Sequence, residues 1–272
     1  MQETHLQNSN EFPPDLKNYE HLYSIINNFA DENDRSSGIC MFINKTESLL
    51  EEQHIIIGRL SYVRLQNSAN NEITNIFSYY GRSRNSRTEW ANSFNEIRDK
   101  VQNNVLENIM VMGDFNFVTS VLDRNSQILN AIDQTATNSF IEIQEELNIF
   151  DSFRLTNPKR RLYSYHHTDG KSKSRIDRIY VDASLSGRAE ATKLEHSQFS
   201  DHKIVRLRMG NNIERGPGSW IFNTSLLDDS NFCNRMINIF REAEIIKPSY
   251  ASKKMFCDYL MMLIQSKLYN FL

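Results

Sequence analysis

Short apolar runs separated by polar turns dominate the first half of the chain and predict the strands of a sheet. The runs are rich in β-branched residues, and a polar NSANN segment at 67–71 is typical of a turn between two of them. A run that ends at Gly113 predicts a buried strand. We expect strands at 39–43, 54–65, 72–80, 108–112, 161–165, 175–181 and 202–209.

Apolar residues spaced three and four positions apart predict helices between these strands. One stripe consists of Trp90, Phe94, Ile97 and Val101 in the segment 86–101. A second stripe runs along the segment 137–147. Because strands and helices are mixed along the chain, we expect the α/β class, with helices packed outside the sheets.

The pattern changes near Asn211, where a segment containing Gly216, Pro217 and Gly218 predicts a domain boundary. We therefore expect one domain over 1–209 and a connecting helical region over 210–272, with helices at 230–243 and 252–272. A stretch of about 60 residues forms a poor core by itself. These helices are thus expected to pack on another part of the protein.

Composition excludes several classes of protein. Of the 272 residues, 39% are hydrophobic and 11% aromatic, which is enough for a large buried core and argues against disorder. The three cysteines are far apart, which argues against a disulfide framework or a zinc module. No apolar run reaches the roughly 20 residues of a membrane span, and the polar N-terminus does not resemble a secretory signal. We expect an intracellular protein.

The net charge of −3 argues against a polycation that coats nucleic acid. The charge is unevenly distributed, however. Residues 1–150 have a net charge of −10 and residues 151–272 a net charge of +7. A basic surface in the second half is therefore still expected.

Three polar clusters lie at the ends of apolar runs, where strands present catalytic groups: Gly113–Asn116, Ser174–Asp177 and Ser200–His202. Each has an ordinary explanation by itself, namely a turn, a cross-strand ion pair or a chance dipeptide. Together they provide carboxylates for a magnesium ion and a water, an amide donor, and a histidine beside a second carboxylate. This set is what metal-assisted phosphodiester hydrolysis requires.

With Gln2–His5 at the start, these motifs resemble, in their order, the endonuclease/exonuclease/phosphatase superfamily. The greatest similarity is to the apurinic-type endonuclease domain of non-LTR retrotransposons, over 1–209, and the segment 216–227 resembles the connection to their reverse transcriptase. The resemblance implies a four-layer, DNase-I-like α/β sandwich of two mixed sheets flanked by helices. It also implies magnesium-dependent nicking of DNA in the nucleus, with a reverse transcriptase domain in the parent polyprotein.

The resemblance also implies roles for single residues. Asp114 would orient or deprotonate the attacking water, and Asn116 would stabilise the transition state. Asp177 would orient His202, which would contact the phosphate, and Tyr80 would donate a hydrogen bond to it.

Further residues would hold the metal and the DNA. The resemblance implies Glu3 as the main magnesium ligand, Asp201 as a carboxylate on the metal side, and Ser164 near the substrate. A basic stretch favours contacts with phosphates, although a solvated basic hairpin explains it equally well. The expected substrate-binding residues of this stretch are Arg154, Arg160, Arg161, Lys171, Lys173 and Arg175.

The chain also departs from the family pattern. The family has a strand before the Gln-Glu-Thr-His motif, whereas this chain starts two residues before Glu3, so we expect the first strand to be missing and a neighbouring strand edge to be unpaired. Two other hypotheses therefore stay open. One is a phosphatase or exonuclease of the same superfamily, and the other is an inactive remnant that binds DNA.

Overall fold

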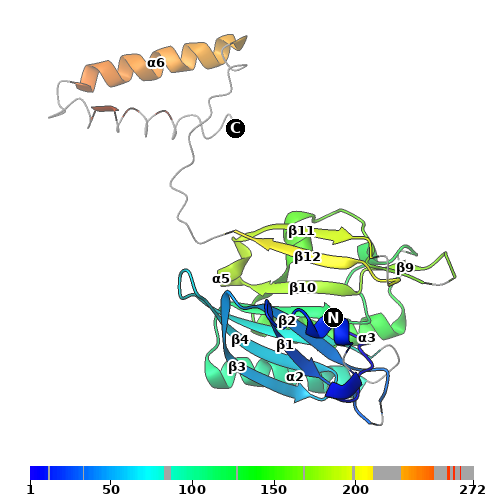
Figure 1. Ribbon diagram of the computed structural model, residues 1–272. Coiled ribbons are helices and arrows are strands. Elements are labelled where there is room, and N and C mark those ends of the chain that lie inside the picture. The colour runs from blue at the N-terminus through cyan, green and yellow to red at the C-terminus, as the bar shows by residue number, and fades with distance from the viewer. Residues whose placement is uncertain are drawn as a thin grey trace. The chain divides into compact units, whose positions relative to one another are not determined.

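The computed structural model describes residues 1–272 except 12, 33, 83–86, 127, 168, 198–199, 211–227, 248–255, 258–259, 261–263 and 265–272. The chain divides into two units, Met1–Asn212 and Ile213–Leu272 (Figure 1). The predicted boundary segment and most of the predicted tail helix lie outside the described residues. In the second unit the predicted helix is α6 (Ser230–Ile246), and it begins at Asp229, whose carboxylate accepts two backbone N–H groups of the first turn.

A six-stranded mixed sheet forms the centre of the first unit. Only β5 and β6 are parallel neighbours, and α2 (Arg87–Asn104) connects them; the other neighbours are antiparallel. The strands lie in the order β3 (Glu47–Ile56), β4 (Leu60–Asn67), β5 (Ile73–Tyr80), β6 (Ile109–Asp114), β10 (Asp177–Asp182) and β7 (Ile149–Asp151).

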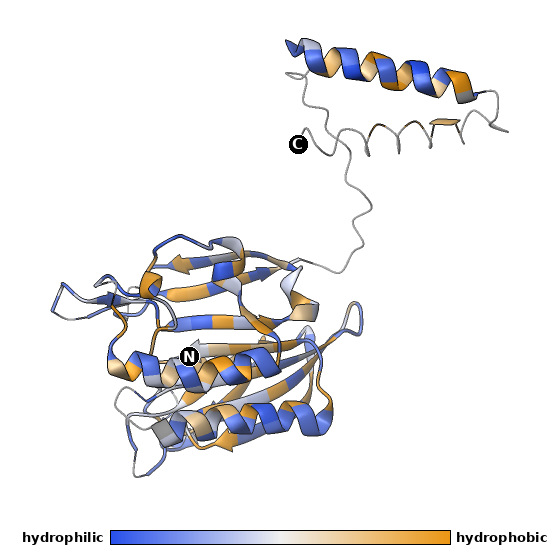
Figure 2. Ribbon diagram, turned by 180° about the vertical axis from the view of Figure 1, so that it is seen from behind, coloured by the Kyte–Doolittle hydropathy of each residue, from blue (hydrophilic) through white to orange (hydrophobic). Residues whose placement is uncertain are grey.

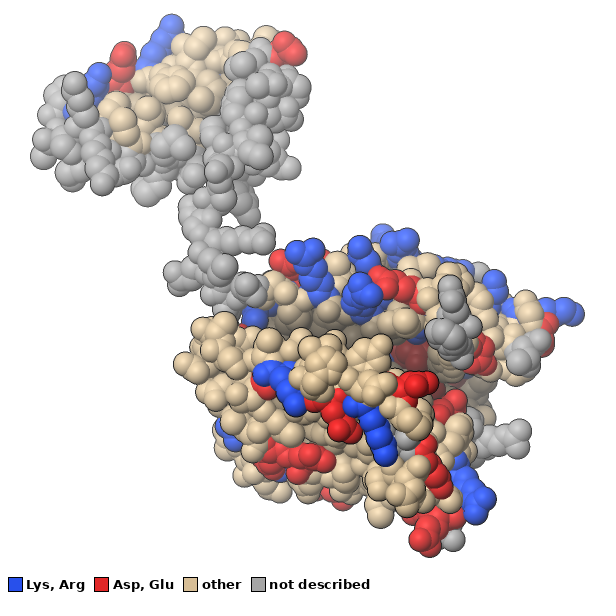
Figure 3. All heavy atoms as spheres, in the orientation of Figure 1, with Lys and Arg blue, Asp and Glu red and all other residues tan. Residues whose placement is uncertain are grey.

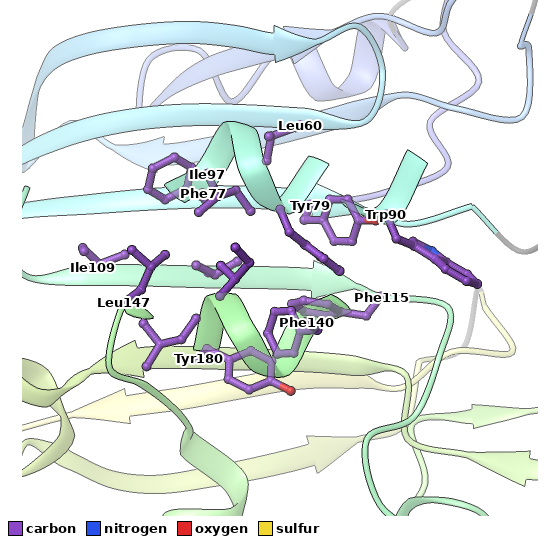
Figure 4. Close-up of a cluster of buried hydrophobic side chains, with 14 of the residues drawn as sticks. Leu60, Phe77, Tyr79, Trp90, Ile97, Ile109, Phe115, Phe140, Leu147 and Tyr180 are labelled. Carbon is purple, nitrogen blue, oxygen red and sulfur yellow. The ribbon is translucent and has the colours of Figure 1, made fainter. Parts of the chain in front are cut away.

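Helices α2 and α3 (Ala131–Glu146) lie side by side on one face of this sheet (Figures 1 and 2). The predicted α2 stripe, Trp90 to Val101, is buried against the sheet. Helix α3 starts six residues before the segment 137–147, because Asn130 and Asp133 form a capping box there. Aromatic rings from both helices and the sheet pack together at this face (Figure 4).

The opposite face of the sheet is covered by two separate pairs of strands. β1 (Tyr23–Asn28) pairs with β2 (Ile39–Asn44), and β11 (Ala189–Glu195) pairs with β12 (Ile204–Met209). Among the described residues no strand joins β2 to β12. The structure confirms a mixed α/β fold with a large mixed sheet and flanking helices. It differs from the expected second mixed sheet, because that layer consists of two-stranded pieces.

Several predicted strands need correction. The apolar run 54–65 is the end of β3 and most of β4, since the chain turns at Gly58, which has a φ of +64°. Of the predicted strand 161–165 only Tyr165 is in a strand, in the small pair β8 (Tyr165–His166) and β9 (Lys173–Ser174). The short helices are η1 (Ser9–Glu11), α1 (Pro14–Lys17), η2 (Val121–Asp123), α4 (Ser152–Thr156) and α5 (Ala183–Ser186).

None of the helices among the described residues combines the length and the apolar character that crossing a membrane requires.

We expect Phe140→Ala to destabilise the first unit by about 3–5 kcal/mol, because the ring is 1% exposed and packs against Phe94 and Tyr180, each with a centroid distance of 4.9 Å. The control is Ile141→Ala on the same helix. Ile141 is 41% exposed, so its loss should change the free energy of unfolding by about 0.5 kcal/mol or less. Urea denaturation measures both, and equal effects of the two substitutions would contradict this packing.

Candidate active site

Three predicted catalytic residues lie in one row across the central sheet. In the strand register, Asp114 of β6 lies opposite both Tyr80 of β5 and Asp177 of β10. Their chain neighbours Tyr79 and Phe115 belong to the aromatic core on the helical face. Because side chains alternate along a strand, the row of Tyr80, Asp114 and Asp177 faces the other side, between the two strand pairs.

Close backbone packing at Gly113 brings this row together. A Cβ atom at Gly113 would lie 1.9 Å from the carbonyl oxygen of Tyr79, and its φ is +142°, so only glycine fits. Beyond it, Asn116 has a φ of +56° and donates its amide to the Gly81 carbonyl at 2.8 Å. The backbone N–H of Asn116 donates to the Asp114 carboxylate at 2.8 Å. The turn that was the ordinary explanation of this motif is therefore present, and it contains the candidate catalytic residues.

His202 joins the row from the segment before β12. Its Nδ1 lies 2.9 Å and 3.1 Å from the two carboxylate oxygens of Asp177. The ring of Tyr165 lies beside the imidazole, with centroids 4.7 Å apart. Asp177 therefore fixes the ring through Nδ1 and leaves Nε2 for another partner.

Buried charge shifts the pKa values of the site. Burial and the neighbouring Asp177 raise the pKa of Asp114, which is 3% exposed, although His202 opposes the shift. Burial lowers the pKa of His202. The hydrogen bond to Asp177 and the negative charges of Asp177 and Asp114 outweigh burial and raise that pKa to about 9. Burial and Glu3 raise the pKa of Tyr80. The cluster thus favours a bound positive charge.

Asp114, Asp177 and His202 offer three ligand atoms within 4.8 Å of one another, so this group could hold a divalent metal ion. Glu3, the expected main ligand, lies next to it and accepts the Tyr80 hydroxyl. Asp201 is exposed and does not belong to the group. The carboxylates suit a hard cation such as magnesium, whereas a histidine nitrogen does not.

Arg175 is not placed as expected for a DNA contact. Its guanidinium is 1% exposed and donates to Asp123 at 2.8 and 3.0 Å and to Asp151 at 2.5 and 3.2 Å. Arg154 binds the same Asp123 and the Arg160 carbonyl. Both cations are therefore used inside the protein, and they hold the segment before Asp177.

Ser164 is likewise a buried anchor. It has no exposed surface, and its hydroxyl accepts the N–H groups of Ile176 and Asp177 at 3.1 and 3.0 Å. Its carbonyl accepts the N–H of Lys203, so one residue ties together the segments that carry Asp177 and His202. It thus positions the site and does not reach a substrate.

The other basic residues are available to solvent. Arg160, Arg161 and Lys171 are exposed, and Lys173 is half-buried. Figure 3 shows lysine and arginine side chains gathered on the side of β11 and β12, whereas acidic side chains predominate on the side of β1 to β4. This distribution agrees with the charge difference between the two halves of the sequence.

No protein-family profile matches the chain. A transposon protein of Xenopus laevis, the uncharacterized 149 kDa protein of transposon TX1, is 27% identical over 214 residues. The match covers 77% of this chain but only 16% of that protein.

Solved structures of nucleases share the architecture. The AP endonuclease LMAP from Leishmania major superposes with a TM-score of 0.62 at 16% identity, covering 77% of both chains. The fold is that of the DNase-I-like nucleases. A 3′-5′ exonuclease from Neisseria meningitidis superposes with a TM-score of 0.60 at 13% identity, covering 77% of this chain and 87% of the exonuclease. The endonuclease domain of TRAS1, a telomere-specific non-LTR retrotransposon, superposes with a TM-score of 0.55 at 12% identity, covering 70% of this chain and 81% of the TRAS1 domain.

Sequence reasoning missed a cation beside this candidate site. Arg59 lies over the Tyr80 ring at 4.5 Å and donates to the Gly81 carbonyl, which also accepts Asn116. Asp34 holds Arg59 in place through two hydrogen bonds. Arg59 sits in the turn after β3, inside a run that looked like one strand, so the sequence contained no signal for its position.

We expect Asp177→Asn to lower the pKa of His202 in the metal-free protein, because the substitution removes the charge that raises it to about 9. A raised pKa means that protonated His202 stabilises the fold fully below the unfolded value of ~6.5, and that this contribution is lost as pH rises through about 9. An NMR titration of the imidazole measures the shift. Asp99→Asn, an exposed control on α2, should leave the titration unchanged; an unchanged midpoint in Asp177→Asn would refute the pairing.

Proposed function

We propose that the unit Met1–Asn212 is a magnesium-dependent DNA endonuclease of retrotransposon origin, which hydrolyses one phosphodiester bond of duplex DNA and leaves a 3′ hydroxyl. The observation that supports this most is the row of Tyr80, Asp114 and Asp177 with His202 bound to its end. The similarity to a transposon protein and to a retrotransposon endonuclease domain supports the origin.

Each side chain has a role that its surroundings favour. Asp114, with its raised pKa, accepts a proton from the attacking water, for which a base with a pKa near neutrality is suited. His202 is protonated at neutral pH and presents Nε2–H to a phosphate oxygen while Asp177 holds the other nitrogen. The Tyr80 hydroxyl, on the strand beside Asp114, and the Asn116 amide, which donates to the neighbouring Gly81 carbonyl, would contact the phosphate.

Glu3 would be the main ligand of the magnesium ion, and the exposed Asp201 would be a carboxylate on the metal side. Glu3 lies close enough to Asp114 for its charge to raise the pKa of that carboxyl. A bound magnesium ion would offset these negative charges and polarise the phosphate. In the absence of a metal, Glu3 accepts the Tyr80 hydroxyl, so this carboxylate is already directed towards the row.

The exposed cations near β8 and β9 would bind DNA phosphates. Their side chains are exposed and take no part in the buried ion pairs of Arg154 and Arg175; these exposed residues are Arg160, Arg161 and Lys171. A DNA substrate implies action in the nucleus. In the parent polyprotein a reverse transcriptase domain would follow, which accords with the small share of the transposon protein that this chain covers.

The same chemistry also suits two other functions. The similarity to a 3′-5′ exonuclease supports an exonuclease or phosphatase, which would act at strand ends. The second, an inactive remnant, would bind DNA through the same exposed cations.

We expect the protein to convert supercoiled plasmid to the nicked form with magnesium and to lose this activity with EDTA. Asp114→Ala and His202→Ala should each lower the rate about 100- to 10,000-fold, which is the usual contribution of a general acid or base. Asp99→Ala and His21→Ala change the same residue types at exposed positions and should nick at the original rate.

The products separate the three functions. Release of nucleotides or phosphate only from strand ends, without nicking, would replace the endonuclease with the exonuclease or phosphatase. Salt-sensitive DNA binding without any hydrolysis would support the hypothesis of an inactive remnant that binds DNA.

The DNA contacts predict a change in salt dependence. Arg160→Ala with Arg161→Ala should reduce the slope of log K against log salt by about 2, because each lost phosphate contact removes about 0.9. Lys17→Ala with Lys45→Ala removes the same charge at exposed positions on the acidic half and should leave the slope unchanged. Fluorescence anisotropy with an uncleavable duplex measures both, and equal slopes would place the DNA elsewhere.

A further inference from the structure

A cavity of about 180 Å³ lies beside Tyr80, between the end of β3 and the first turns of α2. Its lining includes Ile56, Arg59, Tyr80, Arg82, Glu89 and Trp90, and we call it the Trp90 cavity. Tyr80 belongs both to this lining and to the catalytic row. The cavity and the catalytic row therefore share one residue, Tyr80.

The size of the Trp90 cavity restricts what can enter. Pockets for drug-sized molecules measure roughly 300–1,000 Å³. An engineered cavity of roughly 150 Å³ holds a benzene ring. At about 180 Å³, the Trp90 cavity accommodates one ring system and excludes a whole nucleotide or a peptide side chain with its backbone.

A buried donor in this lining lacks a partner. Trp90 is 2% exposed, and its Nε1–H makes no hydrogen bond within the part of the chain that the structure describes. A buried polar group without a partner costs about 1–3 kcal/mol. The nitrogen itself is buried, however, so a ligand in the cavity would meet the carbon atoms of the indole and not this donor.

The charges of the lining disfavour a simple anion. Arg59 binds Asp34, with 2.6 Å between Nη2 and Oδ2, and Arg82 lies between Asp34 and Glu89 at 3.4 and 3.0 Å. Each guanidinium is thus neutralised and offers a flat surface, and Arg59 already stacks over Tyr80. Flat guanidinium and aromatic groups suit a neutral heteroaromatic ring.

We propose that the Trp90 cavity binds a nucleobase of the DNA, next to the phosphate that the catalytic row attacks. A nucleobase is a single neutral ring system, which matches the size of the cavity and its flat guanidinium and aromatic walls. The proposal rests on the proposed function, because DNA at the row brings bases to Tyr80. It implies that the nucleotide beside the cleaved bond influences cleavage.

Tryptophan fluorescence tests the proposal directly. The chain has two tryptophans, so Trp220→Phe leaves Trp90 as the sole indole. In this variant, without magnesium, deoxynucleoside monophosphates should quench the indole emission in a saturable manner as the base stacks near the ring. Deoxyribose 5-phosphate has the same phosphate and no base, and it should leave the emission unchanged.

A pair of matched variants locates the effect. Asn92 lines the Trp90 cavity, is exposed, and lies on α2, so Asn92→Phe should obstruct the cavity and weaken the quenching about tenfold or more. Asn103→Phe makes the same change at an exposed position further along α2, outside the lining, and should bind as before.

The outcomes are distinct. Quenching that requires the base and is lost in Asn92→Phe alone supports the nucleobase site. No quenching, equal quenching by deoxyribose 5-phosphate, or equal effects of both asparagine variants would overturn it. Because the measurement uses no magnesium and no cleavage, it also separates the two proposals. Quenching without plasmid nicking would refute the endonuclease proposal and support the nucleobase site. Nicking without quenching would support the endonuclease proposal and refute the nucleobase site.

Discussion

The candidate site depends on the contact between the backbones of β5 and β6 at Gly113. The Tyr79 carbonyl occupies the place of a side chain there, so the two parallel strands stay paired to their ends. That pairing sets Tyr80 beside Asp114, and the antiparallel pairing of β10 adds Asp177. A larger residue at 113 would push the strands apart and disperse the row. The aromatic core behind the sheet keeps the strands in this register, so the core and the candidate site use opposite faces of the same strands.

Buried ion pairs supply the second constraint. Arg175 donates hydrogen bonds to Asp123 and Asp151 and lies two residues before Asp177 in the chain. The hydroxyl of Ser164 accepts the backbone N–H of Asp177 in the same segment. Removing one partner of such a pair leaves a buried charge uncompensated, at a cost of roughly 3–5 kcal/mol. The segment that carries Asp177 is therefore held rigidly, and His202, which hydrogen-bonds to Asp177, is placed by the same contacts.

The sequence predicted what depends on local pattern. Apolar runs located β2, β5, β6, β10 and β12, and the helical stripe located α2, because each element buries one face. The residues predicted to be catalytic lie at or next to the ends of these elements. The sequence did not predict the features that depend on contacts between residues far apart in the chain. Arg154 and Arg175 look like part of a basic stretch, but their partners lie far away in the chain, at Asp123 for both. The turn at Gly58 was hidden in an apolar run, and with it the position of Arg59 over Tyr80.

The arrangement of charge explains how an acidic protein could act on a polyanion. Burial, together with repulsion from Asp177 on the neighbouring strand, raises the pKa of Asp114, and Asp177 outweighs burial to raise the pKa of His202. Both effects increase the affinity of the cluster for positive charge, whether it is a proton on His202 or a metal ion beside Glu3. Once that charge is bound, the carboxylates no longer repel a phosphate. In the proposed endonuclease the exposed cations would need only to orient the DNA, so a local basic surface would be sufficient without a positive net charge.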